Sequence, residues 1–362
     1  SGSVFIFNVT TGTQLYKLTA NDAADSDMFG RNVAISGIYA IVGAKYDDDN
    51  GSNSGSAYIF DLTSGTQLHK LTASDGVAND HFGRCVDIHA NYAIVGAHFK
   101  DNNGNDSGVA YIFNVTTGTE IHKLTGASDT DSNDYFGYSV AIDGNYAIVG
   151  AYYDDNNGSA YIFNVTTGTE LHKVIDITGA SGDGFGWSVA ISGNYAIVGC
   201  KDNDDNGSSS GSAYIFDVTT GTEIKKIIGI GIDADDKFGQ SVAISGNYAI
   251  VGAPFSPTTH DGGVAYIYGP TEDSLLKITN DSSNMIVNGN VGIGTTSPIT
   301  KLDIRRSGGA RLRLENSAGS YAGQNQAIEF CTTYATTGFL HQKGEDLRIG
   351  VTGSSSTISF YT

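Results

Sequence analysis

A phenylalanine-glycine pair recurs five times in this chain and constrains its fold more than any other feature. The pairs follow one another at steps of 53, 54, 49 and 53 residues, at Phe29, Phe82, Phe136, Phe185 and Phe238. Self-similarity with a period of about 50 residues indicates one structural unit copied along the chain. The content of a single unit therefore predicts the fold of the whole repeated region.

Each unit contains four short runs, here called strands A to D. In the third unit they are Ser139-Val-Ala-Ile, Tyr146-Ala-Ile-Val-Gly-Ala, Ser159-Ala-Tyr-Ile-Phe and Thr169-Glu-Leu-His-Lys-Val. The pair Gly144-Asn145 separates A from B, which predicts a two-residue hairpin turn that needs positive φ. Gly168 fits a left-handed position in a longer C to D hairpin. Each unit is thus predicted to be an antiparallel meander.

Strands B and C are continuous apolar runs, a pattern typical of strands that are covered on both faces. Strand D alternates and carries charge. Such a sheet is not stable alone, and copies at this period bury one another as four-stranded blades of an all-β β-propeller. The glycine of the repeated Val-Gly-Ala is expected where neighbouring sheets approach closely, at Gly43, Gly96, Gly150, Gly199 and Gly252. The 48 glycines against 4 prolines fit this turn-rich fold.

The two ends of the repeat decide the number of blades. The chain opens with a C strand and a D strand that lack their own A and B, so five full units and one half are visible. Asn284–Ile293 can be laid over strands A and B, which favours six blades closed with residues up to about 295. A seventh blade, with strands that precede Ser1, is the alternative. The predicted propeller spans residues 1–270.

A second region, residues 271–362, has a different charge balance. Residues 1–270 hold 12 basic and 31 acidic side chains, whereas residues 271–362 hold 8 of each. Short β-like runs lie there among Gly, Ser and Thr, and their apolar content is thin for an independent core. This pattern favours a β-rich, fibre-like region whose strands pack against other copies of themselves, and we expect it to continue beyond Thr362.

The overall charge excludes two classes of partner. The chain has 20 basic and 39 acidic residues, a formal net charge of −19. Phosphate backbones and anionic lipid repel such a chain, and no run approaches the ~20 apolar residues of a membrane span. We therefore expect neither nucleic-acid binding nor membrane insertion. Cys85, Cys200 and Cys331 are an odd set without metal-ligand spacing.

Acidic residues concentrate in the B to C and D to A loops, which a propeller places on one face. Clustered carboxylates among Asn and Gly form the oxygen-rich setting that calcium prefers. The candidate calcium ligands lie in the B to C loops: Asp47, Asp48, Asp49, Asp101, Asp154, Asp155, Asp202, Asp204 and Asp205. The alternative interpretation is that these are solvated acidic turns that keep a glycine-rich surface soluble.

An aspartate stands two residues before the phenylalanine in every unit. These residues are Asp27, Asp80, Asp134, Asp183 and Asp236. Their regular register predicts a structural task at the base of the loop, the acceptance of backbone hydrogen bonds, in preference to metal ligation.

Catalysis usually needs a unique group of residues that breaks the repeat. The residues that do so are His81, His89, His98, Trp187 and His260, and none has a recognisable partner in the sequence. The chain is therefore predicted not to be an enzyme, and a propeller polysaccharide hydrolase or lyase is the least favoured alternative. A further three histidines share one D-strand position, which suits an exposed outer strand: His69, His122 and His172.

The repeated Phe-Gly-x-Ser-Val-Ala-Ile-x-Gly-Asn-Tyr-Ala-Ile-Val-Gly-Ala resembles the FG-GAP repeats of integrin-α-like β-propellers across roughly residues 1–270. This resemblance implies an extracellular role in adhesion or ligand recognition. Many members of that family hold calcium in an Asp-rich loop between strands A and B. Here a tight Ser-Gly-Asn turn replaces that loop, so the resemblance does not extend to calcium at the family's position.

The segment Asn288-Gly-Asn-Val-Gly-Ile-Gly-Thr-Thr-Ser-Pro298 resembles a motif of phage and viral tail fibres. The resemblance implies a β-rich shaft that is usually trimeric. It predicts self-association of the C-terminal region, as a homotrimer.

Taken together, these patterns predict a non-enzymatic extracellular fibre or appendage subunit. Its propeller head would recognise a host or cell-surface protein or glycan, and its β-rich region would form the shaft. A virion surface fibre is the preferred setting, and a cell-surface appendage is the alternative. A structural filament or coat protein with no foreign ligand is the second function that the sequence leaves open.

Overall fold

The computed structural model describes residues 2–126, 131–256 and 263–269, and the backbone of six short strands between residues 276 and 351. The chain divides into two compact units, Ser1–Arg305 and Arg306–Thr362. In these described parts the regular elements are β-strands and one 3-10 turn, Asp154–Asn156. No helix of the described parts has the length and apolar character needed to cross a membrane.

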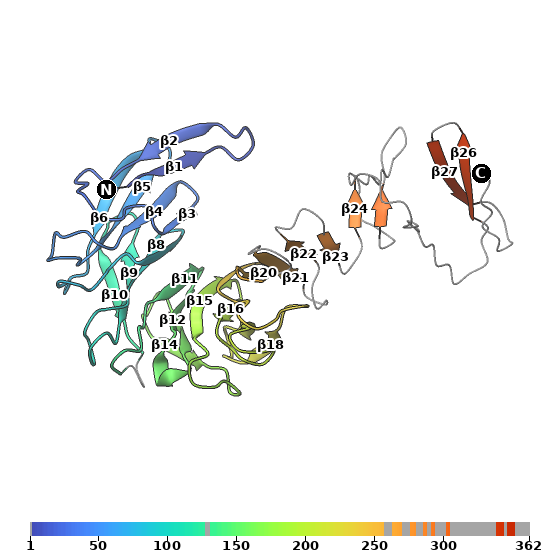
Figure 1. Cartoon of the computed structure of the whole chain (residues 1–362). Helices are drawn as coiled ribbons and strands as arrows, with labels where there is room; N and C mark the ends of the chain where they lie inside the picture. The colour runs from blue at the N-terminus through green and yellow to red at the C-terminus, as the bar shows by residue number, and fades with distance from the viewer. Residues whose placement is uncertain are drawn as a thin grey trace. The chain divides into compact units, whose positions relative to one another are not determined.

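Every Phe-Gly unit forms one antiparallel sheet with its strands in the order A-B-C-D, and Figure 1 shows the sheets following one another along the chain. The first sheet contains β3 (Val33–Ser36), β4 (Tyr39–Ala44), β5 (Ser56–Asp61) and β6 (Thr66–Leu71). The second contains β7 (Cys85–His89), β8 (Tyr92–Ala97), β9 (Val109–Asn114) and β10 (Glu120–Leu124). The third contains β11 (Ser139–Asp143), β12 (Tyr146–Ala151), β13 (Ser159–Asn164) and β14 (Glu170–Val174). The fourth contains β15 (Phe185–Ser192), β16 (Tyr195–Cys200), β17 (Ser212–Asp217) and β18 (Glu223–Ile227). The prediction of repeated four-stranded antiparallel sheets is confirmed.

The two ends of the row differ from its middle. The half unit at the start is a two-stranded sheet of β1 (Val4–Phe7) and β2 (Gln14–Leu18). The fifth sheet contains β19 (Ser241–Ser245), β20 (Tyr248–Ala253), β21 (Val264–Tyr268), β22 (Leu276–Thr279) and a fifth strand, β23 (Met285–Val287). Strand pairing therefore continues past residue 270.

The turns carry the conformations that their residues allow. Asp143 pairs with Tyr146, so Gly144-Asn145 is a two-residue loop. Gly144 has φ +57° while Asn145 is not among the residues with positive φ, which is the pattern of a type II′ turn with glycine first. In the C to D hairpin, Gly168 has φ +69°.

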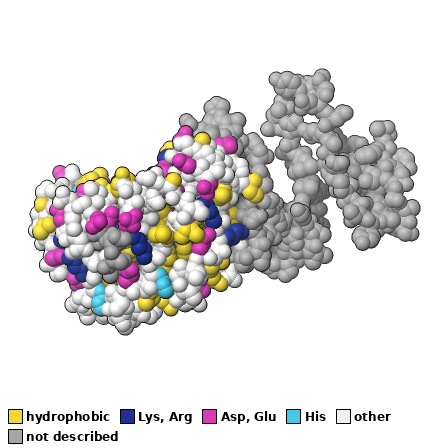
Figure 2. Space-filling model, turned by 90° about the horizontal axis from the view of Figure 1, so that it is seen from below, with side chains coloured by type: hydrophobic (Ala, Val, Ile, Leu, Met, Phe, Trp, Pro, Cys, Tyr) yellow, Lys and Arg dark blue, Asp and Glu magenta, His cyan; other side chains and the backbone are white. Residues whose placement is uncertain are grey.

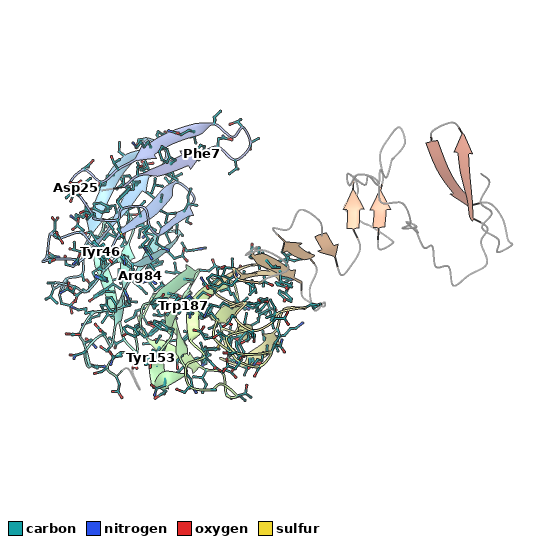
Figure 3. The ribbon with its side chains drawn as sticks, viewed as in Figure 1. Phe7, Asp25, Tyr46, Arg84, Tyr153 and Trp187 are labelled. Carbon is teal, nitrogen blue, oxygen red and sulfur yellow. The ribbon has the colours of Figure 1, made fainter. Side chains whose placement is uncertain are left out.

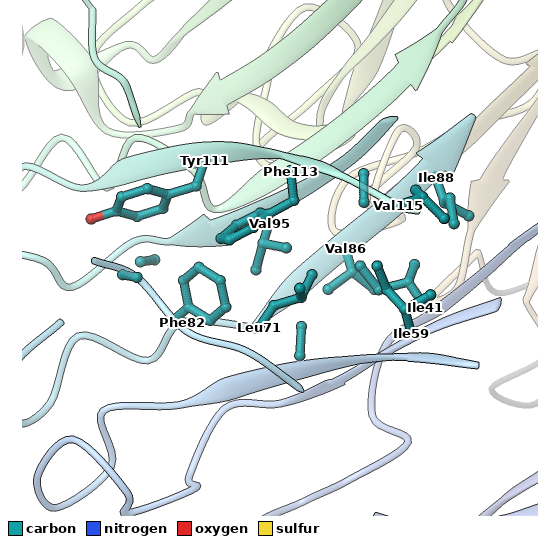
Figure 4. Packing of buried hydrophobic residues seen from close by; sticks show 14 of the residues in the cluster. Ile41, Ile59, Leu71, Phe82, Val86, Ile88, Val95, Tyr111, Phe113 and Val115 are labelled. Atoms are coloured by element: carbon teal, nitrogen blue, oxygen red, sulfur yellow. The ribbon is translucent and has the colours of Figure 1, made fainter. Parts of the chain in front are cut away.

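Neighbouring sheets bury their middle strands against each other. The A strands β3, β7, β11, β15 and β19 contact one another in that order, on the inner side of the curved row of sheets (Figure 1). Figure 4 shows the first interface, where Phe82 of the second unit meets residues of both sheets. Phe82 and Tyr111 have ring centroids 5.6 Å apart, and the equivalent pair recurs in the third unit as Phe136 and Tyr161.

In four of the five sheets the glycine of strand B lies where two sheets meet, as predicted. A Cβ added to Gly43 would be 2.0 Å from the carbonyl oxygen of Gly83, in the next Phe-Gly pair. The same close approach occurs at Gly96, Gly150 and Gly199. Gly252, in the last of the five sheets, meets only Ser241 of its own sheet.

The sequence predicted that the D-strand histidines lie on an exposed outer strand. In the structure each of them contacts the next sheet. Nε2 of His69 lies 3.0 Å from the carbonyl oxygen of Thr116, in the C to D turn of the next sheet. His122 and His172 make the equivalent contacts one and two sheets further along. Each ring also packs over the turn glycine of that next sheet, for example His69 over Gly118. These side chains therefore join neighbouring sheets at their outer edge.

The C-terminal strands are described by their backbone alone. Strand β24 (Val291–Ile293) pairs in parallel with β25 (Leu302–Ile304), and β26 (Gly338–Lys343) pairs with β27 (Asp346–Val351). Within the Asn284–Ile293 segment, β23 pairs with β22 and not with the half unit, so closure and blade number stay predictions. Apart from β24, the motif of residues 288–298 lies outside the described residues.

Candidate functional site

The aspartates that precede each Phe-Gly pair lie at the base of the loops. All five are buried. Each accepts a hydrogen bond from the backbone N–H three residues earlier, as between Asp80 Oδ2 and Val77 N at 2.8 Å. The equivalent bonds are made by Asp27, Asp134, Asp183 and Asp236. The carboxylate therefore closes the turn that enters strand A.

A second buried position faces this aspartate, three residues after strand B, and its chemistry differs between sheets. Lys100 occupies it in the second sheet and places Nζ 2.9 Å from Asp80. Asn203 occupies it in the fourth sheet, where Nδ2 donates to Asp183 at 3.2 Å. The third sheet has Asp154 there instead. Burial, with the nearby charge of Asp154, raises the pKa of Asp134 to about 7.

A lysine of strand D reaches into the acidic loops in four successive sheets. Nζ of Lys70 contacts three carboxylates, with Asp22 Oδ2 at 2.6 Å, Asp47 Oδ2 at 3.1 Å and Asp49 Oδ2 closer still. The corresponding lysines of the next three sheets bind loop carboxylates in the same way: Lys123, Lys173 and Lys226. An internal ammonium thus lies among the carboxylates that were predicted to hold calcium.

The nine candidate calcium ligands have three kinds of surroundings. Asp48, Asp101 and Asp204 each accept a backbone N–H within their own loop, at 2.7 to 2.8 Å. Lysines of strand D bind Asp47, Asp49, Asp154, Asp155 and Asp205. Asp202 pairs with Lys201 and Lys237. Among the residues that the structure describes, one group of three acidic side chains could share a metal ion: Asp22, Asp47 and Asp49.

Aromatic side chains from four successive sheets form a continuous surface beside these loops. We call it the aromatic belt and define it as Tyr46, His81, His98, Phe99, Tyr135, Tyr138, Tyr152 and Trp187. Ring centroids of neighbours lie 4.5 Å apart between Tyr138 and Tyr152 and 4.7 Å apart between Tyr138 and Trp187. In Figure 3, Tyr46, Arg84 and Trp187 mark its course from the first sheet to the fourth. Figure 2 shows hydrophobic side chains gathered between acidic and basic ones on one face.

Cations cover several rings of the belt. The guanidinium carbon of Arg84 lies 3.9 Å from the centroid of Tyr138. Nζ of Lys201 is 4.0 Å from the centroid of the Trp187 ring, and Nζ of Lys45 is 4.1 Å from that of Tyr46. These distances are typical of cation–π contacts.

Two cavities adjoin the belt. The first, of about 330 Å³, is lined by the opening residues of β3, β7, β11 and β15 and by Arg84, Tyr138 and Trp187. The second, of about 620 Å³, lies among loop residues of the third sheet and includes Tyr135 and Tyr152. The belt therefore presents both an aromatic wall and hollows of small-ligand size.

The repeat itself carried a signal for the belt that the sequence analysis did not use. Belt residues occupy three kinds of position beside the residues that are constant between units. These are the position before Phe-Gly, the position after it, and the two positions that follow strand B. The residue after Phe-Gly is one of four different residue types over the five units: Arg31, Arg84, Tyr138, Trp187 and Gln240. Positions that vary inside a constant frame are free to serve recognition, because the fold does not fix them.

The repeat-breaking histidines lie in different places. His81 and His98 belong to the belt, whereas Nδ1 of His89 lies 2.8 Å from Asp143 Oδ1 at the far end of strand A. No serine or cysteine of the described ranges is hydrogen bonded to His89. His260 lies outside the described residues. Burial raises the pKa of the Cys85 thiol to about 12, and Cys200 is fully buried.

The FG-GAP repeat matches five segments that together cover more than half of the chain: residues 13–60, 66–113, 119–163, 169–216 and 222–268. Each segment joins strand D of one sheet to strands A, B and C of the next. No curated protein matches the chain.

Proposed function

This chain belongs to the FG-GAP repeat family, and we propose on that basis that it is the recognition subunit of an extracellular fibre or appendage. FG-GAP repeats indicate a β-propeller domain, which commonly serves adhesion or recognition. The propeller would bind a host or cell-surface protein or glycan through its loop face. A virion surface fibre is the setting we favour, and a cell-surface appendage is the alternative.

The aromatic belt is the observation that carries this proposal. The residues that are constant between repeats are buried in the sheets, as Phe82 and Phe136 are. Many of those that vary gather on one surface, where rings and cations from four sheets meet. Aromatic and arginine side chains provide much of the binding energy at protein recognition surfaces. This division between frame and surface supports recognition over a purely structural role.

The C-terminal region would present the head on a shaft and form a homotrimer. Its charge is balanced, with 8 basic and 8 acidic residues, so like-charge repulsion does not oppose association of copies. Calcium in the acidic loops remains part of the proposal. Where a lysine of strand D binds the loop carboxylates, as Lys70 binds Asp47 and Asp49, we expect calcium to bind only weakly because it has to compete with the ammonium group.

A non-enzymatic role is supported by the surroundings of the nucleophiles. Cys85 and Cys200 are buried within the sheets, so neither presents a thiolate. His89 has a carboxylate partner but lies on an exposed hairpin end.

Binding of the fluorescently labelled full chain to candidate host cells or particles tests the proposal. We expect saturable binding that unlabelled chain competes away. Absence of saturable binding to any surface, together with electron micrographs in which propellers touch one another in a regular array, would instead support the filament or coat function.

A further inference from the structure

The aromatic belt contains positive charge that no carboxylate neutralises, although the chain as a whole is strongly acidic. Among the described residues, Arg31, Lys45 and Arg84 have no carboxylate within salt-bridge distance, whereas Lys100, Lys201 and Lys237 do. All three of these cations affect the Tyr46 hydroxyl group. Nζ of Lys45 donates to the Tyr46 hydroxyl at 3.0 Å, and this bond, with the charges of Arg31 and Arg84, lowers the pKa of Tyr46.

Two imidazoles beside these cations have unused hydrogen-bonding capacity. Nδ1 of His81 and Nδ1 of His98 are buried and have no hydrogen-bond partner, and the His98 side chain is only 4 % exposed. Burial, with the charges of Lys45 and Arg84, lowers the pKa of His81 to about 4. Burial and Arg84 likewise lower the pKa of His98 to about 2. Both rings are therefore neutral near pH 7 and offer one donor and one acceptor nitrogen each.

Two rings of the belt line a cavity. Tyr138 and Trp187 border the cavity of about 330 Å³ together with Arg84. That volume is at the lower end of small-ligand sites, about 300–1,000 Å³. The cavity thus combines a cation, aromatic side chains and the polar side chains of Asn32, Ser139 and Ser188 in a space that suits one or two sugar rings.

We propose that this cavity binds an acidic saccharide, with its carboxylate on Arg84 and its pyranose ring beside Tyr138 and Trp187, whose ring faces are covered by Arg84 and Lys201. This inference rests on the recognition function proposed above and names its ligand class. Guanidinium groups pair with carboxylates through two parallel hydrogen bonds.

The cavity is lined by one cation, Arg84, and one carboxyl group, Asp87, so it suits a ligand with a single carboxylate better than other anions. A polymer with a charge on every unit would be repelled by the acidic loops and by the net charge of −19. A saccharide with one carboxylate among neutral hydroxyls places its charge at Arg84 and its hydroxyls beside the polar lining residues Asn32, Ser139 and Ser188. Sialylated and uronate-containing sugars share this chemistry.

Isothermal titration calorimetry of the full chain tests the assignment. The probes are sialyllactose, a hexuronate oligosaccharide, lactose as the neutral analogue, and a glutamate-rich peptide. We expect at least one acidic saccharide to bind and lactose to bind about tenfold or more weakly, since a charge-assisted pair is worth roughly that factor. Equal binding of lactose, binding of the peptide alone, or no binding of either acidic saccharide would overturn the assignment.

Variants drawn from the repeat itself locate the site. Arg84→Gln and Trp187→Gln introduce the residue that the fifth unit already has, Gln240, and Lys17→Gln removes a charge from the first D strand as the control. We expect the two belt variants to lose about tenfold in affinity for the acidic saccharide and the control to keep it. Loss in all three variants, or in none, would contradict the proposal. Saturable cell binding that acidic saccharides do not inhibit would refute the ligand class and leave the recognition function standing.

Discussion

Lys100 and Asp80 form an ion pair in which both side chains are almost completely buried. They are 4 % and 2 % exposed, and their charged atoms lie 2.9 Å apart. Removal of one partner would leave an isolated charge inside the protein, which is costly. The equivalent pair of the fourth sheet is Asn203 and Asp183. There a neutral amide group donates the hydrogen bond to the buried carboxylate. The identity of one buried residue thus sets the electrostatics of each loop base.

We predict that Lys100→Met lowers the free energy of unfolding by about 3–5 kcal/mol, because it leaves Asp80 charged and unpaired. Lys100→Asn should lose much less, since Asn203 shows that an amide can donate at this position. Urea denaturation measures both values. Equal losses in the two variants would show that the ion pair does not govern stability here.

A pH dependence is expected from Asp87, which replaces the alanine found at this A-strand position in the other units. Burial raises the pKa of Asp87 to about 6 from its ordinary value of 3.8. Between these values the folded protein binds more protons than the unfolded chain, so this group makes stability fall as the pH rises. Asp87→Ala should remove that fall. The difference in unfolding free energy between wild type and variant, measured from pH 4 to 7, checks the sign, and a difference that is flat between pH 4 and 6 would refute it.

At the scale of elements, the glycine of strand B and the Phe-Gly pair of the next unit form the contact between sheets. Gly43 touches the backbone of Gly83, so the contact leaves no room for a side chain. The sheets are also joined by side chains that bind the neighbouring backbone, as when Asn32 accepts the N–H of Val86 at 2.7 Å. Each sheet is therefore complete only beside its neighbour.

Gly43→Ala should lower the free energy of unfolding by about 3 kcal/mol or more, because the new methyl group overlaps a carbonyl oxygen that cannot move without shifting a strand. Gly252→Ala is the matched control, since there the methyl group meets the movable Ser241 side chain. Thermal or urea unfolding of both variants provides the comparison. A similar loss at both glycines would argue against a rigid sheet contact.

The acidic loops give a second prediction at this scale. Lys70→Met removes the ammonium that binds Asp22, Asp47 and Asp49. We expect the variant to have a lower Tm that millimolar calcium restores, roughly the range of extracellular calcium modules. The wild-type loop should respond little, because the ammonium group of Lys70 already lies among the three carboxylates. If a chelator lowers the wild-type Tm and replacing Asp47, Asp48 and Asp49 by Asn abolishes that effect, calcium is the native counter-ion and the lysine account is wrong.

The elements were predictable because local patterns determine them. The period of the Phe-Gly pairs, the apolar B and C strands and the Gly144 turn identified the antiparallel sheets. The role of His69 was not predictable, because its partner is the backbone of Thr116 in the next unit. Contacts between copies depend on how the copies pack, and that information is spread over two repeats.

At the scale of the whole molecule, charge and aromatic surface are segregated. Lysines of strand D bind some carboxylates of the acidic loops, whereas Arg31, Lys45 and Arg84 have no carboxylate among the described residues within salt-bridge distance. The acidic residues were visible in the sequence as clusters, and so attracted the metal prediction. The belt was missed, because Arg84, Tyr138 and Trp187 lie about 50 residues apart and meet only when the sheets stack, and only the variable positions of the repeat signalled it.

Hydrogen–deuterium exchange of the full chain, free and bound to its target surface or saccharide, tests the central claim most directly. The account predicts new protection at the belt segments around His81 to Arg84, His98 to Phe99, Tyr135 to Tyr138 and Gly184 to Trp187. Protection confined to the C to D turns, or to the D-strand edges that join the sheets, would show that recognition occurs elsewhere and would contradict the account.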